Sequence, residues 1–298
     1  MNKHTTGEKF LCLTLDLEND WYFDEPGYDH LTFEYIDTFI DLINDLDVPL
    51  SVFVVGQTLE QYPEEIDRLS NQLECEFHLH SYQHDTSKNY DFREEVINGK
   101  EAYRNHFGRN PTGYRAPQGN IAEHELSLLE ELGFEFDSSI FPSYRPGVYN
   151  NLSAPLTPYT PAGATSLLEI PPGAFSGIRI PTSHSYFKLI GRSLSSYLSV
   201  SPLPEVLVYS IHLQDLFKTA SHDHLPVPKR WIMKRNLNNA ERMLRKNIST
   251  LLSRGYQPRT MTDIYSAHTR DDSYESQTNA PKDHLDPSPV WASAENDD

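Results

Sequence analysis

The chain has 298 residues, a length that fits one large α/β barrel or two smaller domains. Its 43 Asp and Glu residues exceed its 25 Lys and Arg residues, which gives a formal net charge of −18. This charge argues against nucleic acid or an anionic membrane surface as a partner, because both are bound through clustered cations. The first residues are polar and no run approaches about 20 apolar residues, so we expect no secretory signal, no membrane span and a cytoplasmic location.

Short apolar runs alternate with helical patterns along most of the chain. After the first apolar run, Ile36, Phe39, Ile40 and Ile43 have the three-and-four spacing of one helix face. Such patterns predict strands at residues 10–16, 50–56, 75–80, 113–117, 134–140, 167–172 and 205–212. They predict helices at residues 33–47, 59–73, 91–107, 123–133 and 235–255. Strands that alternate with helices predict parallel βαβ units.

Two stretches fall outside this alternation. Residues 142–166 contain five prolines and are expected to form a long loop. Residues 266–298 are rich in acidic and poor in apolar residues, which predicts a disordered, solvated tail. The predicted organisation is an N-terminal extension over residues 1–9, one α/β barrel over 10–265, and the tail over 266–298.

Candidate reactive side chains follow the predicted strands, and in parallel α/β barrels such groups collect at the carboxyl ends of strands. The candidates at these ends are Asp16, Glu18, Asp20, His80, His84, Arg115, Asp137 and His212. Each has an ordinary structural reading as well. An acid after a strand often caps a helix or forms a turn, and a lone histidine is usually a surface residue.

The spacing His80-Ser-Tyr-Gln-His84 points more directly to a metal site. A strand-to-helix turn can direct both imidazoles to one point, and neutral imidazole is the commonest metal ligand. A carboxylate from a neighbouring strand would complete a two-histidine, one-acid face that leaves positions for water and substrate. Zinc or another divalent first-row metal suits such a site. The same spacing also arises by chance, so spacing alone leaves the metal site open.

Five motifs in order resemble the polysaccharide deacetylase family, the family 4 carbohydrate esterases that share the NodB homology domain. They are LTLDLENDW, LSVFVVG, EFHLHSYQH, GYRAPQG and GFEFDSSIFP. The first motif and the segment GIRIPTSHSYFKLI are similar to the branch of this family that is linked to exopolysaccharide synthesis. The resemblance runs from about Phe10 to Ile264 and implies a distorted (β/α) barrel.

The resemblance implies a metal site for zinc, or for cobalt, nickel or manganese in its place. His80 and His84 would be ligands, with Glu18 as the acidic third. Many family members have adjacent aspartates in the first motif, which leaves Asp20 as an alternative to Glu18. The family usually has glycine where this chain has His78, which could be a structural residue or a spare ligand.

The resemblance also implies the acid and the base. Asp16 would be the general base, kept ionised and oriented by Arg115, and backbone N–H groups near the Arg115 turn would help to stabilise an oxyanion. His212 would be the general acid, with its ring fixed by Asp137. Asp16 and Glu18 are two residues apart, so an extended strand end points both the same way.

The implied activity is hydrolysis of an N-acetyl group from an amino sugar in a polysaccharide or its precursor. Two alternatives stay open: an allantoinase-like hydrolase of small cyclic amides, and a glycan-binding barrel without activity. The chain departs from the branch at Gln118, where an aromatic residue is usual, and after His212, where Leu-Gln-Asp replaces Pro-Trp-Glu. These positions concern the substrate groove more than the metal, so the sequence leaves the substrate open.

Overall fold

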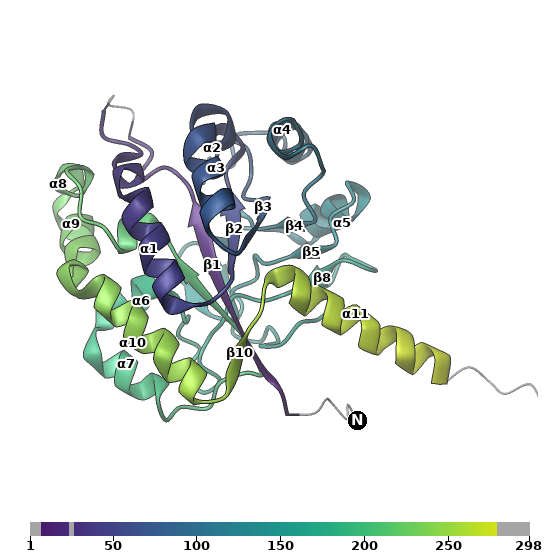
Figure 1. Ribbon diagram of the computed structural model, residues 1–298. Helices are drawn as coiled ribbons and strands as arrows, with labels where there is room; N and C mark the ends of the chain where they lie inside the picture. The colour runs from purple at the N-terminus through teal and green to yellow at the C-terminus, as the bar shows by residue number, and fades with distance from the viewer. Residues whose placement is uncertain (1–6, 24–26, 279–298) are drawn as a thin grey trace, which may run out of the picture.

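The computed structural model describes residues 7–23 and 27–278 (Figure 1). Among these residues, one curved sheet holds eight strands, and all its pairings are parallel. Its strands are β1 (Lys9–Leu17), β2 (Leu50–Val54), β3 (Cys75–Leu79), β4 (Gly113–Tyr114), β5 (Phe136–Asp137), β8 (Leu168–Glu169), β9 (Val206–Ile211) and β10 (Tyr256–Pro258). A separate two-stranded hairpin consists of β6 (Tyr144–Arg145) and β7 (Tyr149–Asn150).

Strand β1 lies at the centre of the sheet. On one edge, the start of β1 pairs with β10 (from Lys9 to Leu11) and the rest pairs with β2 (from Leu13 to Leu17). From β2 the sheet continues through β3, β4 and β5 to β8. The other edge of β1 pairs with β9, with Leu15 opposite Ile211. Just after β8, Gly173 N donates to Val208 O of β9 at 2.9 Å, so the sheet curls almost into a closed barrel. The predicted α/β fold, a distorted barrel, is confirmed, and the ends of β1 and β9 lie side by side.

The helices of the described residues pack around the sheet (Figure 1). They are α1 (Ile36–Leu46), α2 (Gly56–Gln61), α3 (Pro63–Gln72), α4 (Phe92–Phe107), α5 (Glu123–Glu131), α6 (His184–Ile190), α7 (Arg192–Leu198), α8 (Ser221–His224), α9 (Val227–Lys234), α10 (Ala240–Ser253) and α11 (Met261–Thr278). Helix α1 buries Ile36, Phe39, Ile40 and Ile43, as its apolar spacing predicts. The main core forms between β1, β2 and β9 and the helices α1, α3 and α10.

The helix predicted at residues 59–73 is two helices. Helix α2 ends at Gln61 and α3 begins at Pro63, while Tyr62 between them has φ −131° and ψ 49°. Proline has no N–H to donate and disfavours the helical conformation of the residue before it. Pro63 therefore ends one helix and begins the next.

The predicted tail differs from the structure at its start. Helix α11 runs to Thr278, so the chain stays helical beyond Ser266; residues 279–298 lie outside the described part. Met261 and Ile264 are buried and anchor the first turn of α11. A helix whose first turn is packed is already nucleated and can continue through polar residues. Figure 1 shows α11 projecting away from the barrel.

Several elements were not predicted. The expected loop at residues 142–166 contains the β6–β7 hairpin, and α6 to α9 lie between Ser183 and Arg235 where no helix was expected.

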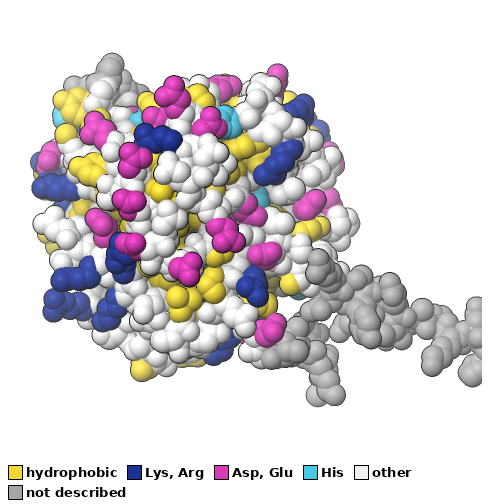
Figure 2. Space-filling model, in the orientation of Figure 1, with side chains coloured by type: hydrophobic (Ala, Val, Ile, Leu, Met, Phe, Trp, Pro, Cys, Tyr) yellow, Lys and Arg dark blue, Asp and Glu magenta, His cyan; other side chains and the backbone are white. Residues whose placement is uncertain are grey.

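No helix among residues 7–23 and 27–278 is long and apolar enough to cross a membrane. On the face that Figure 2 shows, the Asp and Glu side chains are scattered rather than gathered in one patch.

Candidate active site

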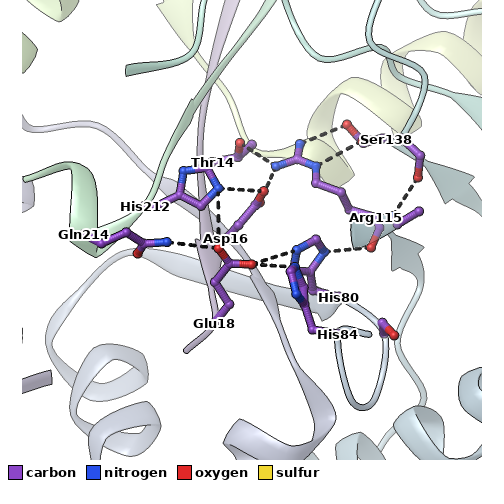
Figure 3. Close-up of polar contacts among 12 residues, drawn as sticks. Thr14, Asp16, Glu18, His80, His84, Arg115, Ser138, His212 and Gln214 are labelled. Carbon is purple, nitrogen blue, oxygen red and sulfur yellow. Dashed lines mark hydrogen bonds and ion pairs between the residues drawn. The ribbon is translucent and has the colours of Figure 1, made fainter. Parts of the chain in front are cut away.

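Glu18, His80 and His84 converge at the carboxyl ends of β1 and β3 (Figure 3). One ligand atom from each lies within 4.8 Å of the other two. Glu18 Oε2 is 2.6 Å from His84 Nε2 and 3.6 Å from His80 Nε2. Two imidazoles and one carboxylate that face one point are a donor set suited to a divalent first-row metal.

Contacts behind this triad hold each ligand in place. His80 Nδ1 donates to Arg115 O at 2.7 Å, which leaves Nε2 free of a proton and able to bind a metal. The His84 ring stacks on Tyr22, with centroids 4.6 Å apart and planes at 4°. Gln214 Nε2 donates to Glu18 Oε1 at 3.0 Å and so leaves Oε2 to face the histidines. These contacts fit a metal site whose ligands are oriented in advance.

The turn between the two histidines is fixed by helix α4. Glu95 of α4 is buried and accepts hydrogen bonds from Ser81 Oγ, from Tyr82 N at 2.9 Å and from Gln83 N at 2.7 Å. Ser81 and His84 have φ values of 68° and 58°, a conformation that costs energy for residues other than glycine. The bonds to Glu95 stabilise that turn.

Asp16 lies beside the triad and is paired with Arg115. Arg115 Nη1 donates to Asp16 Oδ1 at 2.6 Å and to Thr14 Oγ1 at 2.9 Å, while its Nε and Nη2 donate to Ser138. The guanidinium also lies 3.9 Å from the ring centroid of Phe53. Burial alone would raise the pKa of Asp16, but the charge of Arg115 lowers it below the usual value. Asp16 is therefore an ionised carboxylate fixed next to the candidate metal ligands.

His212, at the end of β9, faces the same point from the other side. Its Nε2 is 3.6 Å from Asp16 Oδ2, and its Nδ1 is 3.2 Å from Asp215 Oδ2. Asp215 is buried and forms an ion pair with the buried Lys188, whose Nζ is 2.7 Å from Asp215 Oδ1. Burial would raise the pKa of Asp215, but Lys188 lowers it. Burial would lower the pKa of His212, but the hydrogen bond to Asp215 raises it to about 9.

These groups open into a cavity of about 860 Å³. Five aromatic side chains line it: Trp21, Tyr22, Phe141, Tyr149 and Tyr186. Its lining also includes Asp16, Glu18, His80, His84 and His212, so a molecule in the cavity can reach the triad, the carboxylate and the imidazole together. An arrangement of this kind is chemically suited to metal-assisted hydrolysis.

The family model for polysaccharide deacetylase matches residues 3–136. Over these residues, somewhat less than half of the chain, the sequence is similar to the polysaccharide deacetylase family. The matched part contains Asp16, Glu18, His80, His84 and Arg115, whereas His212 and its partners lie beyond it. No curated protein matches the chain.

Solved structures share the fold over a longer stretch. A candidate polysaccharide deacetylase from Mycobacterium smegmatis aligns over 97% of this chain and 98% of its own, at 19% identity and a TM-score of 0.60. The Bc1960 peptidoglycan N-acetylglucosamine deacetylase aligns over 87% and 89%, at 16% identity and a TM-score of 0.53. A CE4 family pseudoenzyme from Bacillus anthracis aligns over 87% and 66%, at 11% identity and a TM-score of 0.52. These similarities extend the deacetylase fold to the second half of the chain.

The expected partner of His212 in this deacetylase fold was wrong: the structure places Asp215, not Asp137, against its ring. Asp137 is fully buried, accepts a hydrogen bond from Ser139 Oγ at 2.6 Å, and lies beside Glu169. Burial raises the pKa of both carboxyl groups, and Asp137 raises that of Glu169 further, so this pair is more easily protonated than a solvated carboxylate. The sequence signal for Asp215 was its position three residues after His212.

Asp20 and His78 have partners of their own outside the triad. Asp20 does not join the triad: it is buried, and its carboxylate accepts from Thr32 and Ser221. His78 Nε2 is 2.9 Å from Glu76, and its ring lies between Phe53 and Phe136. These contacts make His78 structural.

The amide groups at the Arg115 turn are also engaged. Arg115 N donates to Leu79 O at 3.0 Å, and Ala116 N donates to Ser139 Oγ at 2.7 Å. These two donors are satisfied within the protein and do not provide the expected oxyanion contact.

Proposed function

We propose that the protein is a metal-dependent hydrolase that removes N-acetyl groups from amino sugars of a polysaccharide or its precursor. The observation that carries this proposal is the meeting of three features in one cavity. They are the Glu18–His80–His84 triad, the Arg115-paired Asp16, and the His212 ring supported by Asp215. We further propose zinc as the metal, with cobalt, nickel or manganese able to replace it, and membership of the branch linked to exopolysaccharide synthesis.

A bound divalent metal would polarise the acetyl carbonyl and lower the pKa of water at the site. Asp16 would accept the proton of the attacking water, because Arg115 keeps this carboxylate ionised and occupies only its Oδ1. Its Oδ2 remains directed toward His212 and the cavity.

His212 would give a proton to the departing amine, since a neutral amine is a far better leaving group than its anion. Asp215 bonds to Nδ1 of this ring, so Nε2 is the atom that faces the cavity and Asp16. Lys188 keeps Asp215 ionised and thereby keeps the ring in this orientation. Together these groups provide a base and an acid next to each other at one site.

The cavity supports a glycan over a small cyclic amide. At about 860 Å³ it lies toward the upper end of typical ligand pockets, and its aromatic rings offer flat surfaces for sugar rings. The pseudoenzyme among the structural neighbours means that the fold alone does not carry activity. The proposal rests instead on the triad, the base and the acid of this chain.

Metal analysis combined with acetate release tests the proposal. The purified protein, loaded with zinc, is incubated with a panel of N-acetylated glycans and with allantoin. Acetate from one or more glycans and no turnover of allantoin is expected. Turnover of allantoin alone would support the small-amide alternative. No reaction with any member, at full metal occupancy, would support a binding protein.

A further inference from the structure

Two cations line the catalytic cavity without a carboxylate partner among the described residues. Arg145 lies in the β6–β7 hairpin and Lys229 in α9, and both are exposed at the cavity. Neither side chain has a hydrogen bond or an ion pair with the described part of the chain. The protein has a net charge of −18, yet these two cations at one cavity have no ion pair among the described residues.

The carboxylates that line the same cavity are all engaged. Asp16 pairs with Arg115, Glu18 with the two histidines, and Asp215 with Lys188. Asp20 accepts from Thr32, and Asp85 accepts from Ser87 N at 2.8 Å and Asn89 N at 3.1 Å. None of these acids has a hydrogen bond or an ion pair with Arg145 or Lys229.

An aromatic side chain holds Lys229 near the cavity, and the β6–β7 hairpin places Arg145 there. Lys229 Nζ lies 5.1 Å from the ring centroid of Trp21, which is itself fixed because its Nε1 donates to Ser221 Oγ at 3.1 Å. Arg145 shares its hairpin with Tyr149, whose ring stacks on Phe141 at 5.9 Å. The cation–π contact of Lys229 with Trp21 positions its charge without neutralising it.

The two cations also lie within electrostatic range of each other. Burial lowers the pKa of Lys229, Glu18 opposes that effect, and Arg145 lowers the pKa further. This repulsion is relieved if an anion occupies the space that both cations face.

We infer that Arg145 and Lys229 form a subsite for an anionic group of the substrate. This inference rests on the proposed function and narrows it to N-acetylated glycans that carry a carboxylate, sulfate or phosphate beside the acetylated sugar. The anionic group would bind between the two side chains while the acetamide reaches the Glu18–His80–His84 triad. Both cations are part of the same cavity as the triad, so one short oligosaccharide can span both sites.

Equilibrium binding to Asp16→Asn protein tests the subsite without turnover. The probes are oligosaccharides of equal length: neutral chitin fragments, hyaluronan fragments with carboxylates, and chondroitin sulfate fragments with added sulfate. Uridine diphosphate N-acetylglucosamine serves as the phosphate probe. We expect tighter binding of one or more anionic probes than of the neutral one, and a loss of that preference as salt rises.

Substitution of the two cations identifies them as the source of the preference. In the Asp16→Asn background, Arg145→Gln and Lys229→Gln should each weaken binding of the preferred anionic probe about tenfold, with little change for chitin fragments. Arg192→Gln and Lys246→Gln are matched controls, because these exposed cations lie on α7 and α10 outside the cavity lining. The two control substitutions should change neither the affinity for the preferred anionic probe nor that for chitin fragments.

The outcomes separate this inference from the proposed function. Equal affinities for neutral and anionic probes, unchanged in Arg145→Gln and Lys229→Gln, would overturn the subsite, even where wild-type protein releases acetate from chitin fragments. Selective binding of an anionic probe that depends on both cations would support the subsite, even where the wild type releases no acetate from any glycan.

Discussion

Three carboxylates at the end of β1 have three different partners. Asp16 pairs with Arg115, Glu18 faces His80 and His84, and Asp20 bonds to Thr32 and Ser221. The two-residue period of a strand keeps Asp16 and Glu18 on one side. Glu18 directly follows Leu17, the last residue of β1, whereas Asp20 lies further along the chain, where that period no longer applies, and its carboxylate anchors the loop that follows.

The different partners predict different effects of substitution. Loss of a residue that only supports a metal ligand weakens metal binding by about 10- to 100-fold. Glu18→Ala removes a ligand itself and should weaken zinc binding by more than that. Asp20→Ala should keep the metal but lower the free energy of unfolding by about 2 kcal/mol, because Thr32 and Ser221 lose a buried acceptor. Competition with a chelator and chemical denaturation measure the two effects. Loss of metal in Asp20→Ala with retention in Glu18→Ala would transfer the ligand role to Asp20.

The partner of His212 makes a second prediction at this scale. Asp215→Asn should lower kcat by about 100-fold or more, because the ring loses the charge that orients its proton. Asp137→Asn should leave kcat within a few-fold of the wild type, because Asp137 bonds to Ser139 and Glu169 instead. Melting temperatures serve as a folding control, since Asp215→Asn also leaves Lys188 buried without its counter-ion. The opposite ranking of the two variants would restore Asp137 as the orienting residue.

At the scale of elements, Glu76 joins two strands and a helix. Its carboxylate accepts from Ser51 Oγ of β2 at 2.8 Å and from Thr262 N of α11 at 3.1 Å, and lies 2.9 Å from His78 Nε2 within β3. Burial would raise the pKa of Glu76, but these hydrogen bonds lower it to about 2. The deprotonated carboxylate therefore stabilises the base of the barrel.

This lowered pKa predicts an acid-sensitive step in stability. The contribution of Glu76 is fully present above its unfolded pKa of 4.5 and is lost as the pH falls from 4.5 toward 2. Over that range it amounts to about 3 kcal/mol. Denaturation at a series of pH values should show a shallower acid dependence for Glu76→Gln than for the wild type. Glu74 is exposed, so Glu74→Gln is the matched control and should show the acid dependence of the wild type. If Glu76→Gln also showed the acid dependence of the wild type, Glu76 would not be the group that stabilises the barrel in this pH range.

The elements themselves were unequally predictable. Strands β1, β2, β3 and β9 and helices α1, α4 and α10 have regular apolar periods and lie where these periods predict. The helices α6 to α9 have at most eight residues each, too short for a period to stand out. Lys188, Arg145 and Lys229 lie in such short elements, so the sequence alone gave no reason to place them at the site.

At the scale of the whole molecule, the barrel brings together side chains that are far apart in sequence. Asp16 and Arg115 meet because β1 and β4 lie in one curved sheet, and His212 joins them because β9 pairs with β1. The rule that strand ends converge grouped the candidate side chains, and the resemblance to the deacetylase family implied which of them form the triad. It could not identify which acid supports His212, because Asp137 ends β5, Asp215 follows β9, and only the packing distinguishes them.

Helix α11 allows a prediction about the end of the described chain. Truncation after Thr269 keeps Met261, Ile264 and the bond from Thr262 N to Glu76, so the free energy of unfolding should change by less than about 0.5 kcal/mol. Truncation after Thr260 removes these contacts and should cost about 4 kcal/mol, from two buried apolar side chains. Chemical denaturation of both forms measures the difference. A large loss in the longer form would mean that residues beyond Thr269 stabilise the barrel.

The central claim is that the Glu18–His80–His84 triad holds the metal on which deacetylation depends. The most direct measurement is acetate release from an N-acetylated glycan while metal-free protein is titrated with zinc. We predict that the rate rises linearly to about one equivalent and then stays constant, as for one catalytic site. His84→Ala should show no rise at that metal concentration. A rate that is independent of added zinc, or equal in the wild type and His84→Ala, would contradict the account.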